Sequence, residues 1–202
     1  MTTVITGDII GSRKVHSEVW LPELKSFFSE KKGINKWDVF RGDSFQLEAE
    51  PESAFEIALC IKALIKSTGK LDVRMAIGMG SKDFEGPSVS ESYGTAFIRS
   101  GESLDAIKNT SFIIRSDQLN SDNYFNPILK LISFIADSWK PVTAATVFFA
   151  LNNSGMLQKE MAQQLGKDET TISKSLKRAA YHEMVEIIDI YKKLYTHDTA
   201  AS

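Results

Sequence analysis

The chain of 202 residues is long enough for one large domain or two small ones, and its 43% of hydrophobic residues suffices for ordinary globular cores. Its net charge of −2 excludes a globally basic surface, so any contact with nucleic acid has to come from a local patch. A single cysteine excludes an internal disulfide framework, and no apolar run reaches the roughly 18 residues of a membrane span. With no signal sequence before the first strand, we expect a cytoplasmic protein with no membrane partner.

Strand and helix patterns alternate through the first 115 residues. Apolar residues spaced by three and four predict the helices, and short β-prone runs predict the strands. In chain order we predict a strand at 2–6, a loop at 7–14, a helix at 21–32, strands at about 37–41 and 44–49, a helix at 51–68, a strand at 71–79, a loop at 81–92, a helix at 93–107 and a strand at 111–115. This order predicts a ferredoxin-like α+β domain with its helices on one face of the sheet.

The strongest local signal in this part is Arg41-Gly42-Asp43-Ser44, which lies between two β-prone runs and predicts a tight hairpin. Asp43 would stand near the tip of that hairpin, and Asp8 follows the first strand. Each acid has a simple alternative role as a turn former. If the two converge, they could instead hold Mg²⁺ or Mn²⁺, hard cations that take oxygen ligands and are shared with substrate phosphates. Gly7 and Gly11 would then leave backbone room for those phosphates.

Composition changes after Arg115, where the stretch 116–126 is polar and rich in turn formers and no later segment resembles a strand. We place the domain boundary there. The prediction is an α/β domain at 1–118, a linker helix within 119–140 and an all-α unit at 141–202. After the boundary, helices are predicted at 127–139, 142–151, 157–165 and from 169 through at least 195.

The segment 158–177 has the spacing of a helix-turn-helix. Ala162 is small enough for two helices to cross closely, and Gly166 can adopt the positive φ of a tight turn. Ile172 and Leu176 can pack the second helix back onto the first. Asp168 is placed to cap that second helix. The segment resembles the helix-turn-helix of bacterial repressors and of sigma-factor DNA-binding regions, although Leu157 stands where such motifs often carry a capping Thr or Ser.

The second helix of this motif combines small hydroxyl residues at its start with cations further along, which suits a helix in the major groove. The stretch 156–181 contains five cations and three acids, so it is locally basic. The residues predicted to reach base edges are Thr170, Thr171 and Lys174. Those predicted to contact phosphates are Lys177 and Arg178. The alternative interpretation is a helical hairpin that packs or dimerises without DNA.

Four segments of the N-terminal part form an ordered set: Asp8-Ile-Ile-Gly-Ser12, Arg41-Gly-Asp-Ser-Phe45, Val73–Gly80 and Tyr93–Leu104. In this order they resemble the first metal motif, the Gly-Asp motif, the strand after them and the helix that follows in class III nucleotidyl cyclases. The GGDEF-type diguanylate cyclases share this core. Together with the helix-turn-helix, the whole chain resembles the SatD family of small bacterial proteins.

The resemblance implies that Asp8, Asp43 and the Ile9 carbonyl are metal ligands. It implies a nucleotide site made by Gly7, Gly11, Ser12, Arg41, Gly42 and Arg99. Active cyclases place an Asn and an Arg on the helix after the fourth strand, to orient the ribose and stabilise the transferring phosphate. Aligning Leu104 with the family's leucine puts Arg99 and Ser103 at those positions, so the catalytic half of the site does not match.

The favoured hypothesis is a DNA-binding transcriptional regulator whose cyclase-like domain binds a nucleotide with a divalent metal, without efficient turnover. We expect a homodimer, because a single recognition helix gives limited specificity and because class III cyclases act as dimers. The alternative is a divergent nucleotidyl cyclase or nucleotidyltransferase with a helical assembly tail. In a third reading, Asp8 and Asp43 only form turns.

Overall fold

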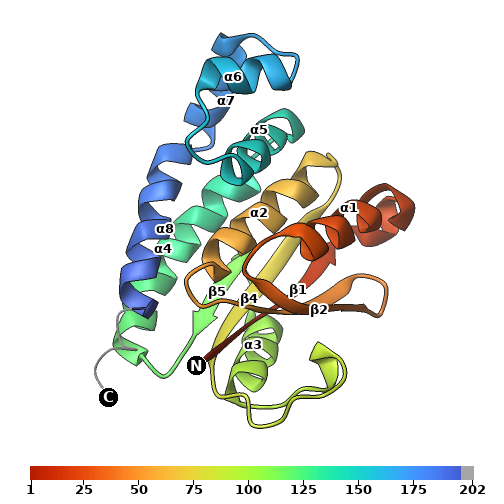
Figure 1. Cartoon of the computed structure of the whole chain (residues 1–202), viewed down its shortest axis with the longest axis vertical. Coiled ribbons are helices and arrows are strands. Elements are labelled where there is room, and N and C mark those ends of the chain that lie inside the picture. The colour runs from red at the N-terminus through yellow and green to blue at the C-terminus, as the bar shows by residue number, and fades with distance from the viewer. Residues whose placement is uncertain (197–202) are drawn as a thin grey trace.

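Five strands in the first 115 residues form one mixed sheet, and the described residues that follow form helices joined by turns (Figure 1). This computed structural model describes residues 1–196; the last six residues of the predicted helix-turn-helix unit, 197–202, lie outside the described part. The strands are β1 (Thr2–Ile10), β2 (Ile34–Phe40), β3 (Ser44–Ala49), β4 (Asp72–Gly80) and β5 (Phe112–Arg115). Their order is β2-β3-β1-β4-β5, with every neighbouring pair antiparallel except β4 and β5.

Eight α-helices complete the described residues. They are α1 (Ser17–Glu30), α2 (Ala54–Ser67), α3 (Thr95–Ala106), α4 (Leu119–Asp137), α5 (Pro141–Asn152), α6 (Gln158–Gln164), α7 (Glu169–Arg178) and α8 (Tyr181–Thr196). Within residues 1–196 the strands lie before residue 116 and only helices and turns follow, which confirms the prediction of a mixed chain with its strands in the N-terminal part. None of the helices in residues 1–196 is both long and apolar enough to cross a membrane.

The sheet has helices on both faces, so the prediction of helices on one face is wrong. Figure 1 shows α1 and α2 on one side of the sheet and α3 on the other. On the α3 side, the hydroxyls of Thr6 and Ser100 are 2.8 Å apart. A Cβ on Gly78 would lie 2.2 Å from the carbonyl oxygen of Ala96, so only a glycine lets α3 approach β4 this closely.

Several predicted boundaries are also wrong. The single helix predicted from 169 through at least 195 is divided into α7 and α8, because Ala180 between them has a left-handed backbone (φ 52°). The loop predicted from Gly7 begins later, because β3 and β4 pair with β1 on both sides and carry the strand on to Ile10. Helix α4 begins at Leu119 rather than at Pro127, inside the stretch predicted to be turns. There the buried Asp122 carboxylate accepts hydrogen bonds from the Ser116 amide (2.6 Å) and hydroxyl (2.8 Å), which fixes the first turn of the helix.

One hydrophobic core runs from the sheet through α2 into the helical half. The ring of Phe55 on α2 lies 5.5 Å from that of Phe125 on α4 and 5.6 Å from that of Tyr191 on α8. The Tyr191 hydroxyl donates to the Pro51 carbonyl (2.7 Å). The ranges 1–118 and 141–196 therefore share buried surface, although a smaller core made by α5, α6 and α7 is separate.

Candidate functional site

The two acids predicted to bind metal lie at the same end of the sheet. In the ladder between β1 and β3, Asp8 stands opposite Ser44, the neighbour of Asp43. The Ile9 amide donates to the Asp43 carbonyl (2.8 Å), so the hairpin is bonded to β1 beside both acids. The hairpin therefore brings the backbone of Asp43 beside Asp8 and Ile9 near the end of β1.

The side chains of the two acids have different partners. Arg74 on β4 holds both oxygens of Asp8, with Nε to Oδ1 at 2.7 Å and Nη2 to Oδ2 at 2.9 Å. This hydrogen bonding raises the pKa of the Arg74 guanidinium above its usual value. Asp43 instead accepts a hydrogen bond from the Ser12 hydroxyl at Oδ2 (2.9 Å). Sequence reasoning missed Arg74 as the partner of Asp8, and only the register of β1 against β4 identifies it.

The turn of the hairpin is exposed and has left-handed backbone at two positions, Arg41 (φ 53°) and Gly42 (φ 84°). A Cβ on Gly42 would meet no atom within 4 Å, so the glycine is needed for its conformation and not for close packing. Gly11 (φ 82°) turns the chain at the end of β1 and precedes Ser12, the partner of Asp43. These four predicted site residues, Gly11, Ser12, Arg41 and Gly42, lie at the same end of the sheet as Asp8.

Two other predicted nucleotide ligands lie elsewhere. Gly7 is buried within β1, where a Cβ would come within 2.4 Å of the Phe45 ring, so its small size serves core packing. Arg99 on α3 donates to the Met79 carbonyl (2.5 Å) and pairs with Asp117. Met79 stands opposite Thr3 in the ladder, five residues from Asp8, so this arginine lies roughly 15–20 Å from Asp8 along the strand.

As arranged, Asp8, Asp43 and the Ile9 carbonyl do not form a ready metal site. Within residues 1–196, no group of three or more His, Cys, Asp or Glu residues is placed to hold an ion. Mg²⁺ in nucleotide sites needs only one or two carboxylates besides the phosphates. Here, however, Asp8 is already neutralised by Arg74, so a metal at Asp8 has to compete with that ion pair.

Asp8 and Arg74 also line an open hollow of about 640 Å³ beside β4 and β5. Two further carboxylates, Asp72 and Asp137, and one further cation, Lys108, line it. Each of these carboxylates is already paired with a cation, Asp8 with Arg74 and both Asp72 and Asp137 with the buried Lys62.

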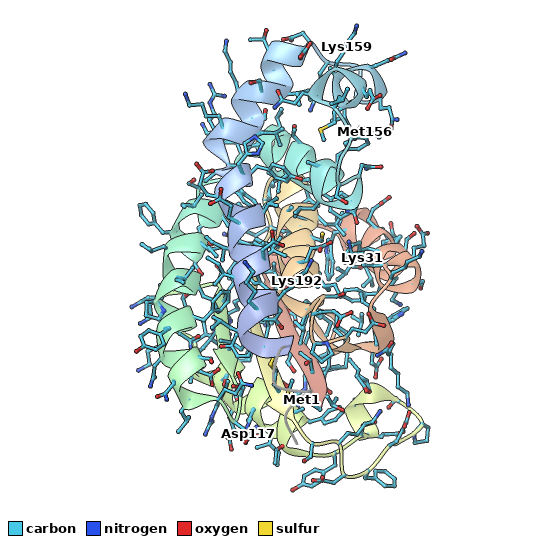
Figure 2. The ribbon with its side chains drawn as sticks, turned by 60° about the vertical axis from the view of Figure 1, so that its left-hand side comes forward. Met1, Lys31, Asp117, Met156, Lys159 and Lys192 are labelled. Carbon is cyan, nitrogen blue, oxygen red and sulfur yellow. The ribbon has the colours of Figure 1, made fainter. Side chains whose placement is uncertain are left out.

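Where the sequence predicts a helix-turn-helix, the structure has two short helices, α6 and α7, joined by a turn. Gly166 has a φ of 61° at the turn between α6 and α7. The residues predicted to pack the motif are buried in one small cluster, namely Met161, Ala162, Ile172 and Leu176, joined by Ala150 of α5. Figure 1 shows α6 and α7 at one end of the molecule, beyond α5, and Figure 2 shows Lys159 of α6 at the outer tip.

Both helices of the motif are capped by local acids. Asp168 accepts hydrogen bonds from the Thr171 amide (2.8 Å) and hydroxyl (2.6 Å), as predicted, and these bonds lower the pKa of the Asp168 carboxyl. At the start of α6, Leu157 has no side-chain acceptor to offer. Instead, the Glu160 carboxylate accepts from the Leu157 amide (3.0 Å), which satisfies one of the free N–H groups of that turn.

The predicted DNA-binding side chains fall on two faces of α7. Thr170 and Lys177 are exposed away from the core. Thr171, Lys174 and Arg178 line a groove of about 710 Å³ between α7 and the start of α5. Lys140 also lines this groove, and no carboxylate does. Sequence reasoning missed Lys140, which the Lys-Pro pair at the predicted start of α5 could have indicated as a residue of the helix entry.

Comparison with known proteins adds no family assignment: no protein-family model matches this chain, and no curated protein or solved structure is significantly similar to it.

Proposed function

We propose that this chain is a DNA-binding regulator of transcription, with α7 as the helix that enters the major groove. The observation that carries the proposal is the two-sided character of α7. Ile172, Ser175 and Leu176 are buried against α5 and α6, whereas the opposite side presents hydroxyls and cations to solvent at one end of the molecule. A short helix fixed in this way by a tight turn can be inserted into a groove as a rigid unit.

The contacts divide by chemistry. Thr170 and Lys174 are placed to reach base edges from the first two turns of α7. Lys177 and Arg178 follow them and are suited to phosphates, as is Lys140 across the groove. We assign Thr171 to capping rather than to base reading, because its hydroxyl is already bonded to Asp168.

Selection from a pool of random DNA duplexes tests this function and should enrich a defined sequence at low salt. Lys177→Ala should weaken binding to all sequences and reduce the slope of log K against log salt by about 1. Lys174→Ala should also relax the selected sequence. Lys25→Ala, an exposed cation on α1, is the matched control and should change neither quantity. If no sequence is enriched, the proposed function is wrong.

A second proposal concerns the N-terminal part. The antiparallel order β2-β3-β1-β4, with α1 and α2 as the connections outside the hairpin, supports a ferredoxin-like, cyclase-like assignment. We propose that a nucleotide with Mg²⁺ or Mn²⁺ binds at the end of β1 beside Asp8 and Asp43, in exchange for the Arg74 contact. The shared position of Asp8, Ile9 and the Asp43 backbone supports this placement.

Binding of Mn²⁺, followed by electron paramagnetic resonance with and without ATP or GTP, tests the second proposal. Arg74→Gln should tighten Mn²⁺ binding because it frees Asp8, and Asp43→Asn should weaken it. Asp83→Asn, an exposed carboxylate at the other end of the sheet, is the control. Sustained release of pyrophosphate that Asp43→Asn abolishes would instead favour the enzyme hypothesis. Equal Mn²⁺ affinity in all variants would leave Asp8 and Asp43 as turn and ion-pair residues only.

A further inference from the structure

Helix α4 carries an apolar stripe that the other described residues leave exposed. Phe134 is 81% exposed, Tyr124 75% and Leu131 67%, and these are among the largest apolar side chains in contact with solvent. The buried side of α4 packs against β5 and α8. Figure 2 shows α4 at the outer edge of the molecule, with no other element on its outer side.

The spacing of this stripe is that of a helix-pairing seam. Tyr124, Ile128, Leu131 and Ile135 follow one another at intervals of four, three and four residues, with Phe134 beside them. Apolar residues repeating in this 3.5-residue pattern mark the line along which a helix packs on a second helix. Ile128 and Ile135 are partly buried against the core, so they form the inner margin of the seam and hold its position.

The exposed apolar area is comparable with the apolar part of a standard interface. A Phe or Tyr side chain buries about 150–250 Å² when it is fully covered, so Tyr124 and Phe134 together offer roughly 250–400 Å². Leu131, which is 67% exposed between them, adds to this. Monomers rarely expose contiguous apolar patches larger than about 300–600 Å². A standard interface takes about 800 Å² from each partner, of which a little over half is non-polar, so these three side chains supply most of its apolar area.

We propose that the stripe Tyr124, Ile128, Leu131, Phe134 and Ile135 is the interface of a homodimer, in which α4 packs on α4 of a second copy about a twofold axis. A twofold axis brings the same patch of both subunits together, so a single self-complementary stripe is sufficient. The stripe ends at Ile135, three residues before Ser138, where the lining of the groove beside α7 begins, so the dimer would lie next to the DNA-binding surface without using its residues.

Analytical ultracentrifugation of the full chain gives a direct test. The wild type should sediment as a dimer. Leu131→Asp with Phe134→Asp should weaken the association by at least about a hundredfold, because two exposed apolar contacts are lost on each subunit. Val19→Asp, at a 58% exposed position on α1, is the matched control and should leave the dimer intact. Far-ultraviolet circular dichroism verifies that each variant is folded. A monomeric wild type, or a dimer that survives the double substitution, would overturn the proposal.

Cross-linking provides a second test that does not weaken the interface. The only native cysteine, Cys60, is buried, and burial raises its pKa to about 12, so it does not compete in disulfide formation. Leu131 lies at the middle of the stripe, close to the twofold axis for either direction of the partner helix. Leu131→Cys should therefore give a covalent dimer on mild oxidation, and Val19→Cys should not. Equal cross-linking at both positions would count against the interface. If the wild-type chain dimerises but enriches no sequence from the pool of random DNA duplexes, only the DNA proposal is contradicted.

Discussion

The cap of α7 shows how much of the helix-turn-helix depends on one residue. The Asp168 carboxylate accepts hydrogen bonds from both the amide and the hydroxyl of Thr171, in the first turn of the proposed recognition helix. These bonds satisfy one of the free N–H groups that every helix leaves at its start, and the negative charge lies at the positive end of the helix dipole. A local interaction of this kind depends only on neighbouring residues, which is why the sequence predicts it correctly.

Asp168→Ala should lower the melting temperature of the protein at neutral pH and reduce protection of the α7 amides from hydrogen exchange. The pKa of Asp168 is lowered below 3.8 in the folded state, so its stabilising effect is present above that value and is lost as pH falls through the folded pKa. The difference in melting temperature between wild type and variant should therefore shrink on acidification below about pH 4. Thr170→Ala, at an exposed position in the same turn, is the control and should leave the melting temperature unchanged. If the difference in melting temperature between wild type and Asp168→Ala persists at low pH, the carboxylate is not its cause.

At the scale of elements, a buried lysine joins α2, β4, β5 and α4. The Lys62 side chain is 0% exposed, and its Nζ donates to Asp72, to Asp137 (2.5 Å) and to the Ser111 hydroxyl (2.8 Å). Lys66 adds a second contact to Asp72 (3.1 Å). These partners are far apart in the chain, so the sequence shows Lys62 only as a polar residue within an apolar helix.

Lys62→Met should destabilise the protein by about 3 kcal/mol, because two carboxylates lose a buried cation. This is the lower end of the range for broken buried pairs, since Asp72 and Asp137 keep contact with water, at 25% and 47% exposure. Lys66→Met should cost less, because Lys62 still compensates both acids. Urea denaturation measures the free energies of unfolding, and the exposed Lys193→Met provides the baseline. If Lys62→Met lowers the free energy of unfolding no more than Lys66→Met does, Lys62 is not the main partner of the two carboxylates.

The elements that sequence reasoning predicts well are those fixed by local signals. The Gly-Asp hairpin, the turn at Gly166 and the helix α2 need only neighbouring residues, and all three are present. The errors arise where distant residues decide. The start of α4 depends on Asp122, whose carboxylate also accepts a hydrogen bond from Tyr195 (2.9 Å), and the partner of Asp8 depends on strand register. Of the ligands predicted from motifs, those in the two turns therefore lie at the same end of the sheet as Asp8, whereas Arg99 lies too far from Asp8 to share a site with it.

At the scale of the whole molecule, the two halves of the chain share a core instead of meeting at a polar boundary. Phe55, Phe125, Tyr191 and Tyr195 form one aromatic cluster that joins α2 to α4 and α8. Helix α8 follows α7 directly and runs back along α4 (Figure 1). A change at the α/β part could therefore reach the helix-turn-helix through packed side chains, which is the physical requirement for coupling a ligand to DNA binding.

This shared core predicts that the described residues unfold in one transition. Tyr191→Ala should cost about 3–5 kcal/mol, because it removes a fully buried ring from the junction of three helices. Tyr191→Phe should cost only about 1 kcal/mol, since it keeps the ring and loses the hydrogen bond to Pro51. In single-tryptophan variants, fluorescence of Trp20 on α1 and of Trp139 between α4 and α5 should report the same midpoint in urea, and Tyr191→Ala should lower both midpoints together. If Trp139 alone moved, the helical half would be an independent domain, and coupling between nucleotide and DNA would need a route other than this core.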